Sequence, residues 1–211
     1  MKPQAYLTLK KSGRKEIVIQ RSRFIGQAWP CETEEEALSW LRLTRESMRD
    51  ASHHCYAYII GNNEGILRYS DDGEPGGTAG MPIISYLRAE HLVDCCLVVT
   101  RYFGGILLGT GGLVRAYTQA AREAGADSGI VRMELTCRDL CEVPYSYWDT
   151  IRYHLNQLPA RICDLEFGSA VSFILLTRAA DRGNVLSALE QASDRTLLSL
   201  YDGESFDAWD V

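Results

Sequence analysis

The chain has 211 residues, of which 46% are hydrophobic and 24% charged, and its formal net charge is −6. This length allows one large or two small domains, and the composition is typical of a soluble globular protein. No run approaches the roughly 18 uninterrupted apolar residues of a membrane helix, so we expect no membrane partner. Seven cysteines without regular spacing predict reduced, mostly buried thiols, as in a cytoplasmic protein.

The charge is unevenly distributed along the chain. Residues 1–127 carry 15 basic and 15 acidic side chains, whereas residues 128–211 carry 7 and 13. Residues 1–30 alone hold seven basic side chains and one acidic side chain. The basic residues that could form a nucleic-acid-binding patch there are Lys10, Lys11, Arg14, Lys15, Arg21 and Arg23. Such a patch attracts phosphate backbones, and the alternative is an ordinary solvated hairpin.

The first part of the chain predicts strands and helices in mixed order. Helices are expected from Thr33, which forms a capping box with Glu36, to about Arg49, and over residues 78–90. The apolar run 94–100 predicts a strand that is buried on both faces and therefore central in its sheet. The other extended segments are expected at residues 6–9, 16–29, 53–60 and 66–69.

The next helix is the best defined by its pattern. Its apolar residues recur at the helical spacing of a buried stripe, and they are Leu113, Ala116, Tyr117, Ala120, Ala121 and Ala124. Gly125 is the expected C-cap of this helix. With residues 127–129 it marks the expected domain boundary.

The rest of the chain follows a different order of elements. Helices are expected over residues 146–157 and 181–192, and an acidic tail over residues 202–211. Strands are expected over residues 130–143, 161–167, 170–177 and 196–201. The resulting β-α-β-β-α-β order is that of a ferredoxin-like domain. We therefore predict an α+β protein with domains at residues 1–127 and 128–211.

Two glycine-rich runs, Ser70–Gly80 and Arg101–Gly112, hold nine of the 18 glycines. Glycine permits positive φ and close backbone approach, so the runs predict either a binding site or tight turns needed for packing. The second run leads into a helix, whose first N–H groups can bind an anion. The residues of this candidate anion or phosphate site are Arg101, Gly104, Gly105, Gly109, Gly111, Gly112 and Arg115.

The first run contains the candidate catalytic groups. Asp72 and Glu74 could bind a divalent metal or act as acid and base, while the alternative is an Asx-turn that bonds its own backbone. His53 is the third candidate, although a structural histidine is the alternative. His53 and His54 are adjacent on a strand and point to opposite faces, so they do not share a metal. No dedicated metal or cofactor site is predicted.

Several motifs resemble the IMPACT/YigZ family. They are Ser22–Gly26, His53–Tyr58, Asp71–Pro75 with Gly77–Gly80, Val98–Gly105 and Leu108–Tyr117. The resemblance implies a first domain similar to the second domain of a small-subunit ribosomal protein, and a second domain similar to ferredoxin-like modules of elongation factor G. The chain departs from the family at His54, where Asn is usual, and at Gly76, where Ser is usual.

Two functions from different classes remain open from the sequence. The family implies a translation-associated regulatory or binding protein that contacts RNA, the ribosome or a translation-factor partner through its first domain. The alternative is a hydrolase or phosphoryl-transfer enzyme that acts on a small anionic substrate at the glycine-rich loops. The choice depends on whether the two glycine-rich runs meet in one place.

Overall fold

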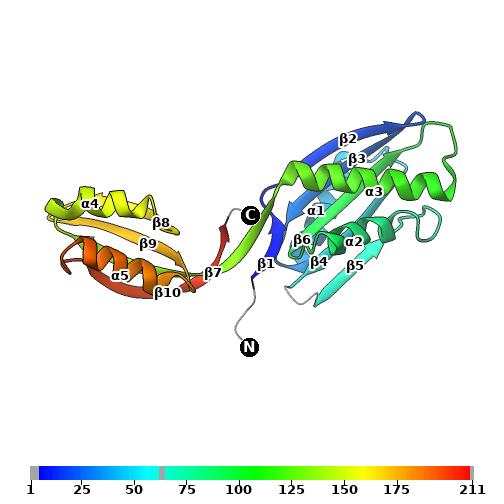
Figure 1. The fold of residues 1–211 in the computed structure, drawn as a ribbon. Coiled ribbons are helices and arrows are strands. Elements are labelled where there is room, and N and C mark those ends of the chain that lie inside the picture. Colours follow the sequence, from blue (N-terminus) through cyan, green and yellow to red (C-terminus); the bar gives the residue numbers. More distant parts are fainter. Residues whose placement is uncertain (1–4, 62–64, 210–211) are drawn as a thin grey trace. The chain divides into compact units, whose positions relative to one another are not determined.

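The computed structural model describes residues 5–61 and 65–209. It consists of two compact units (Figure 1), a larger one formed by 6–133 with 208–209 and a smaller one formed by 134–207 with Ala5. The described residues form two five-stranded sheets with accompanying helices. The predicted α+β class is therefore confirmed. The two units divide inside strand β7 (Ile130–Val143), whereas the boundary expected at residue 127 lies in the last turn of helix α3 (Gly109–Ser128).

The larger unit is built on an antiparallel sheet with the strand order β2-β3-β6-β4-β5. Strand β6 is central and its first seven residues are buried, which confirms the prediction from the apolar run. A further strand, β1, pairs with the beginning of β7. The strands of this unit are β1 (Tyr6–Leu9), β2 (Gly13–Ile19), β3 (Ser22–Pro30), β4 (His53–Ile60), β5 (Ile66–Ser70) and β6 (Cys95–Tyr102).

Helices cover both faces of this sheet, as Figure 1 shows. Alternate residues of β6 point to opposite faces. Leu97 and Val99 therefore pack with α2 (Gly80–Ala89) and α3, while Cys96 and Val98 pack with α1 (Glu34–Ser47). These two apolar layers form the core that holds the ends of the strands in place.

Thr33 caps α1 as predicted, while Glu36 bonds the amide of the residue before the N-cap and not that of Thr33. The Thr33 hydroxyl accepts a hydrogen bond of 3.2 Å from the Glu36 amide, and the Glu36 carboxylate accepts one of 2.8 Å from the Glu32 amide. These contacts satisfy two amide groups at the start of the helix, where no intrahelical acceptor is available.

Helix α3 confirms its predicted buried stripe but not its predicted end. All six stripe residues are buried, yet the helix continues to Ser128 and its C-cap is Gly129, with φ of 67°. Gly125 lies inside the helix, and glycine is needed there because a Cβ would come within 2.1 Å of Tyr86 Oη. The expected cap at Gly125 is therefore wrong, and this glycine makes room for an aromatic ring of α2.

The smaller unit has the predicted β-α-β-β-α-β order, and its strands lie in the order β10-β7-β9-β8. Phe173 and Leu175 of β9 pack with residues of both helices in its core. The elements after β7 are α4 (Tyr145–Leu155), β8 (Ala160–Phe167), β9 (Val171–Arg178), α5 (Arg182–Ala192) and β10 (Leu198–Trp209). The acidic tail expected from Asp202 is strand as far as Trp209; the Asp202 carboxylate accepts a hydrogen bond of 2.9 Å from Arg138 of β7.

The described residues also bear on two predictions from composition. All seven cysteines are free thiols and six of them are buried, which confirms the predicted state of the cysteines. Within residues 5–61 and 65–209, none of the helices combines the length and apolar character needed to cross a membrane.

Candidate functional site

The two glycine-rich runs meet at a buried ion pair. Glu74 lies in the loop between β5 and α2, and Arg101 lies near the end of β6. Arg101 Nη1 donates a hydrogen bond of 2.7 Å to Glu74 Oε1, and only 6% and 3% of the two side chains are exposed. A buried ion pair is stable only when its remaining polar atoms are also bonded, so its neighbours determine its role.

The Glu74 carboxylate is also bound by helix α3. Tyr117 Oη donates a hydrogen bond of 2.8 Å to Glu74 Oε1, and His53 Nε2 lies 3.9 Å from the same oxygen. Burial raises the pKa of Tyr117, so its hydroxyl keeps its hydrogen and acts as the donor. The carboxylate therefore joins the first glycine-rich loop to β4, β6 and α3.

The Arg101 guanidinium is enclosed by aromatic rings. Its central carbon lies 5.4 Å from the ring centroids of both Phe24 and Phe103, a cation–π arrangement. Arg101 Nη2 lies 3.4 Å from Ser22 Oγ. Among the described residues, Arg101 Nε has no hydrogen-bond partner. The anion that Arg101 binds in this structure is thus a carboxylate of the same chain.

Asp71 shapes the first glycine-rich loop through backbone amides. Its Oδ2 atom accepts a hydrogen bond of 2.8 Å from Gly77 N, and its Oδ1 atom accepts bonds of 3.0 and 2.8 Å from Ala79 N and Gly80 N. Gly80 begins α2, so this carboxylate satisfies amides at the helix start where negative charge is favourable.

Asp72 fastens the same loop to two other elements. Its carboxylate accepts a hydrogen bond of 2.9 Å from Arg45 of α1 and one of 2.7 Å from the His54 amide of β4. The Asp72 carboxylate therefore bonds to other elements and not to the backbone of its own turn, as the Asx-turn alternative would require. The part of the chain that the structure describes contains no group of three or more His, Cys, Asp or Glu side chains that could hold a metal ion.

The two adjacent histidines have separate surroundings. His53 Nδ1 donates a hydrogen bond of 2.8 Å to the Asp72 carbonyl, and His54 Nδ1 lies 3.1 Å from Thr100 Oγ1. Burial lowers the pKa of His54, so its neutral form is favoured. The structure thus brings His53, and not the side chain of His54, to the Glu74 cluster.

The second glycine-rich run is divided between a loop and a helix. Gly104 is required by close packing, because a Cβ there would come within 2.1 Å of the Arg21 carbonyl carbon. Gly109, Gly111 and Gly112 form the first turn of α3, which has no side-chain N-cap. Arg115 is exposed on this helix and its Nε atom donates a hydrogen bond of 3.2 Å to the Gly111 carbonyl. Gly105 has a φ of 80° and open space around its Cβ position.

The predicted basic patch lies on and beside the β2–β3 hairpin. Arg23 forms an ion pair of 2.9 Å with Glu16, and Lys15 forms one of 3.4 Å with Asp127. Lys10, Lys11, Arg14 and Arg21 are exposed. The patch is therefore partly neutralised, and its exposed charges lie at the hairpin turn, at the start of β2 and just before it.

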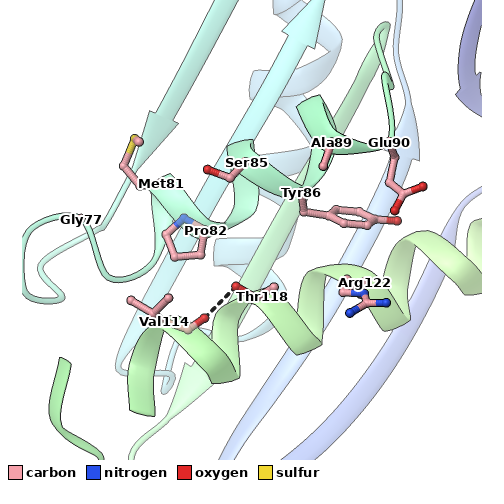
Figure 2. A pocket seen from close by; sticks show the side chains of 10 residues that line it. All are labelled: Gly77, Met81, Pro82, Ser85, Tyr86, Ala89, Glu90, Val114, Thr118 and Arg122. Carbon is pink, nitrogen blue, oxygen red and sulfur yellow. Dashed lines mark hydrogen bonds between the residues drawn. The ribbon is translucent and has the colours of Figure 1, made fainter. Parts of the chain in front are cut away.

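A groove between α2 and α3 was not predicted from the sequence. The groove has a volume of about 520 Å³. Figure 2 shows Met81 and Val114 at one end of it and Glu90 with Arg122 at the other. Most of its residues come from α2 and α3, which are separated in the chain by β6, so periodicity within one helix cannot reveal it. Ser22 and Tyr117 were also missed as site residues, although a buried tyrosine hydroxyl usually needs a hydrogen-bond partner.

This geometry defines a class: an α+β protein of two units, in which a buried carboxylate–guanidinium pair joins two glycine-rich loops. Residues 20–125 match the Impact N-terminal domain. The IMPACT family member YvyE of Bacillus subtilis is 38% identical over 80% of this chain and 78% of its own length. The IMPACT family member YigZ of Escherichia coli is 35% identical over 83% of this chain and 86% of its own. The chain belongs to the IMPACT family.

A solved structure supports the same overall fold. A crystal structure of a hypothetical protein matches with a TM-score of 0.61 and 30% identity, over 96% of this chain and all of that one. The family resemblance inferred from the motifs is confirmed by the match to the family model and by the two relatives.

Proposed function

We propose that this protein is a cytoplasmic, translation-associated binding protein whose larger unit contacts RNA, the ribosome or a translation-factor partner. The observation that carries the proposal is the exposed positive charge at the β2–β3 hairpin, including Lys11, Arg14 and Arg21, on a chain with a net charge of −6. These charges lie along the hairpin, from just before β2 to its turn, and exposed positive charge attracts phosphate even when the whole protein is acidic.

The folds of the two units support an association with the translation machinery. We propose that the smaller unit is a ferredoxin-like domain resembling modules of elongation factor G, since its strand order β10-β7-β9-β8 is the one expected for that fold. The larger unit is, on this proposal, an IMPACT-type domain similar to the second domain of a ribosomal protein. The excess of acidic side chains in residues 128–211 argues against phosphate binding by the smaller unit.

The contacts of the candidate catalytic residues favour binding over catalysis. Glu74 is buried and bonded to Arg101 and Tyr117, while Asp72 is bonded to Arg45 and a backbone amide. A general acid or base must reach the substrate, and both carboxylates have structural partners instead. The enzymatic alternative would be favoured by a thermal stabilisation that requires both a divalent cation and a nucleotide.

The test is equilibrium binding to purified bacterial ribosomes and ribosomal RNA over a series of salt concentrations. The charge-reversed double variant Arg14→Glu with Arg21→Glu should bind at least about tenfold more weakly, and its salt slope should fall by about 0.7–0.9 for each phosphate that is no longer neutralised. Arg152→Glu, in an exposed pair of the smaller unit, is the control and should bind as the natural protein does. Absence of binding at low salt, or binding that ignores both salt and the hairpin charges, would disprove the proposal.

A further inference from the structure

The loop between β6 and α3 exposes three large apolar side chains close together in the chain. Phe103, Ile106 and Leu107 are 48%, 40% and 85% exposed, and we call these three residues the apolar tip. Exposed apolar side chains that occur singly need no explanation, but a group of them on one loop marks an interaction site. Gly104 and Gly105, which lie between Phe103 and Ile106, have no side chains that could cover the apolar tip.

The base of this loop is firmly held. The Phe103 and Gly104 amides donate hydrogen bonds of 3.1 Å to Ser52 Oγ and Ser22 Oγ, respectively. The buried Arg101 guanidinium lies against the Phe103 ring, and Arg101 is itself fixed by Glu74. The buried ion pair and these two hydrogen bonds thus hold Phe103 at the base of the loop, which lowers the ordering cost of binding through its ring.

Two exposed arginines lie near the apolar tip, and the Asp50 carboxylate beside its base accepts a hydrogen bond of 3.1 Å from Tyr102 Oη. Gly104 packs directly on the backbone of Arg21, which is exposed at the turn of the basic hairpin. Figure 1 shows the β2–β3 turn, the β6–α3 loop and the β5–α2 loop at the same end of the larger unit. The three carboxylates of the β5–α2 loop are all bonded within the chain, those of Asp72 and Glu74 to arginines and that of Asp71 to backbone amides. Arg115, exposed on the first turns of α3, adds a further positive charge.

We propose that the apolar tip binds unpaired bases of RNA. A base offers a flat apolar face and its backbone offers phosphates, so a surface with an aromatic ring, aliphatic side chains and nearby arginines complements both. Phe103 stacks on a base, Ile106 and Leu107 pack beside it, and Arg21 and Arg115 contact the flanking phosphates. In a duplex the base faces are hidden, so the site selects single-stranded or bulged segments. This inference rests on the proposed function and names the form of RNA that is bound.

The test compares binding of a fluorescently labelled single-stranded RNA of mixed sequence with binding of its blunt duplex. The natural protein should prefer the single strand. Leu107→Ser and Phe103→Ala should each lower the affinity for the single strand about fivefold or more, without changing the salt slope, because base stacking contributes about 1–3 kcal/mol and involves no counterion. Leu43→Ser is the matched control, since Leu43 is 48% exposed on α1, and should have no effect. Leu107→Ser is the safer variant for folding, because that side chain is almost fully exposed.

Each outcome decides between the two proposals. If hairpin variants weaken RNA binding and tip variants do not, the tip inference is wrong and the proposed function stands. If tip variants weaken binding to intact ribosomes but not to single-stranded RNA, the tip docks on protein and the inference is again wrong. If tip variants weaken RNA binding while salt and hairpin variants do not, the electrostatic proposal and the phosphate contact of Arg21 are wrong, and only the contact of the tip with bases stands. If neither RNA nor ribosomes bind at low salt, both are wrong.

Discussion

Glu74 connects groups that lie far apart in the chain. Its carboxylate meets Arg101 and Tyr117 directly, and His53 lies 3.9 Å away. The motifs predicted that Glu74 and Arg101 belong to a site, but spacing alone could not show that they bond to each other. Tyr117 was predicted only as part of a buried stripe, because helical periodicity reports which face is buried and not what its hydroxyl contacts.

Replacing Glu74 should destabilise the protein strongly. Glu74→Ala leaves the Arg101 guanidinium buried without its counterion, so we expect a decrease of about 3–5 kcal/mol in the free energy of unfolding, measured by urea titration. The double variant Glu74→Gln with Arg101→Met should be destabilised by less than the sum of the two single variants, because it leaves no unpaired charge.

The matched control is an exposed ion pair. Asp149→Ala removes the partner of Arg152, whose side chain is 63% exposed, and should change the unfolding free energy by less than about 1 kcal/mol. Equal effects of Glu74→Ala and Asp149→Ala would show that the buried pair does not hold the two loops together.

At the scale of elements, local signals located most helices and strands but not all of their ends. The Thr33 cap of α1 and the apolar run of β6 depend on residues near in sequence, and both were predicted correctly. The end of α3 was predicted wrongly. Gly125 is glycine because the ring of Tyr86 from α2 packs against it, and the positive φ of the C-cap is found at Gly129. Residues 202–211 were predicted to be a tail because they are acidic. They continue β10 as far as Trp209 because this strand pairs with β7, and a pairing with a distant segment is not visible in the local sequence.

The loop geometry gives a test at two glycines of the glycine-rich runs. Gly104→Ala should destabilise the protein by about 1–3 kcal/mol, since the new Cβ would overlap the Arg21 backbone and force the β6–α3 loop and the hairpin apart. Gly76→Ala should stay within about 0.5 kcal/mol, because nothing lies within 4 Å of its Cβ position and its φ is not in the left-handed region. Thermal or urea unfolding of both variants measures the difference, and similar values would mean that the loop can move away from the hairpin.

Across the whole molecule, the burial of the cysteine side chains indicates how far solvent is excluded from the cores. Six of the seven are buried and Cys163 is half-buried. Burial raises the pKa of Cys55 to about 12, which keeps it in the unreactive thiol form at neutral pH.

The reactivity of the thiols should therefore change sharply on unfolding. Under native conditions a colourimetric thiol reagent should react readily with one cysteine at most, and Cys163→Ser should abolish that reaction. In denaturant all seven should react. Fast reaction of several thiols in the native protein would show that a core opens to solvent.

The division of the chain between the two units has a consequence for biosynthesis. Strand β10 begins in the smaller unit, but Ala208 and Trp209 belong to the larger one, where Trp209 is 7% exposed. The larger unit can therefore reach its final state only after the sequence of the smaller unit has been synthesised. At about 5–20 residues per second, the nascent larger unit waits on the order of 10 s between residue 133 and residue 208. Its last step of folding is thus set by the pace of elongation.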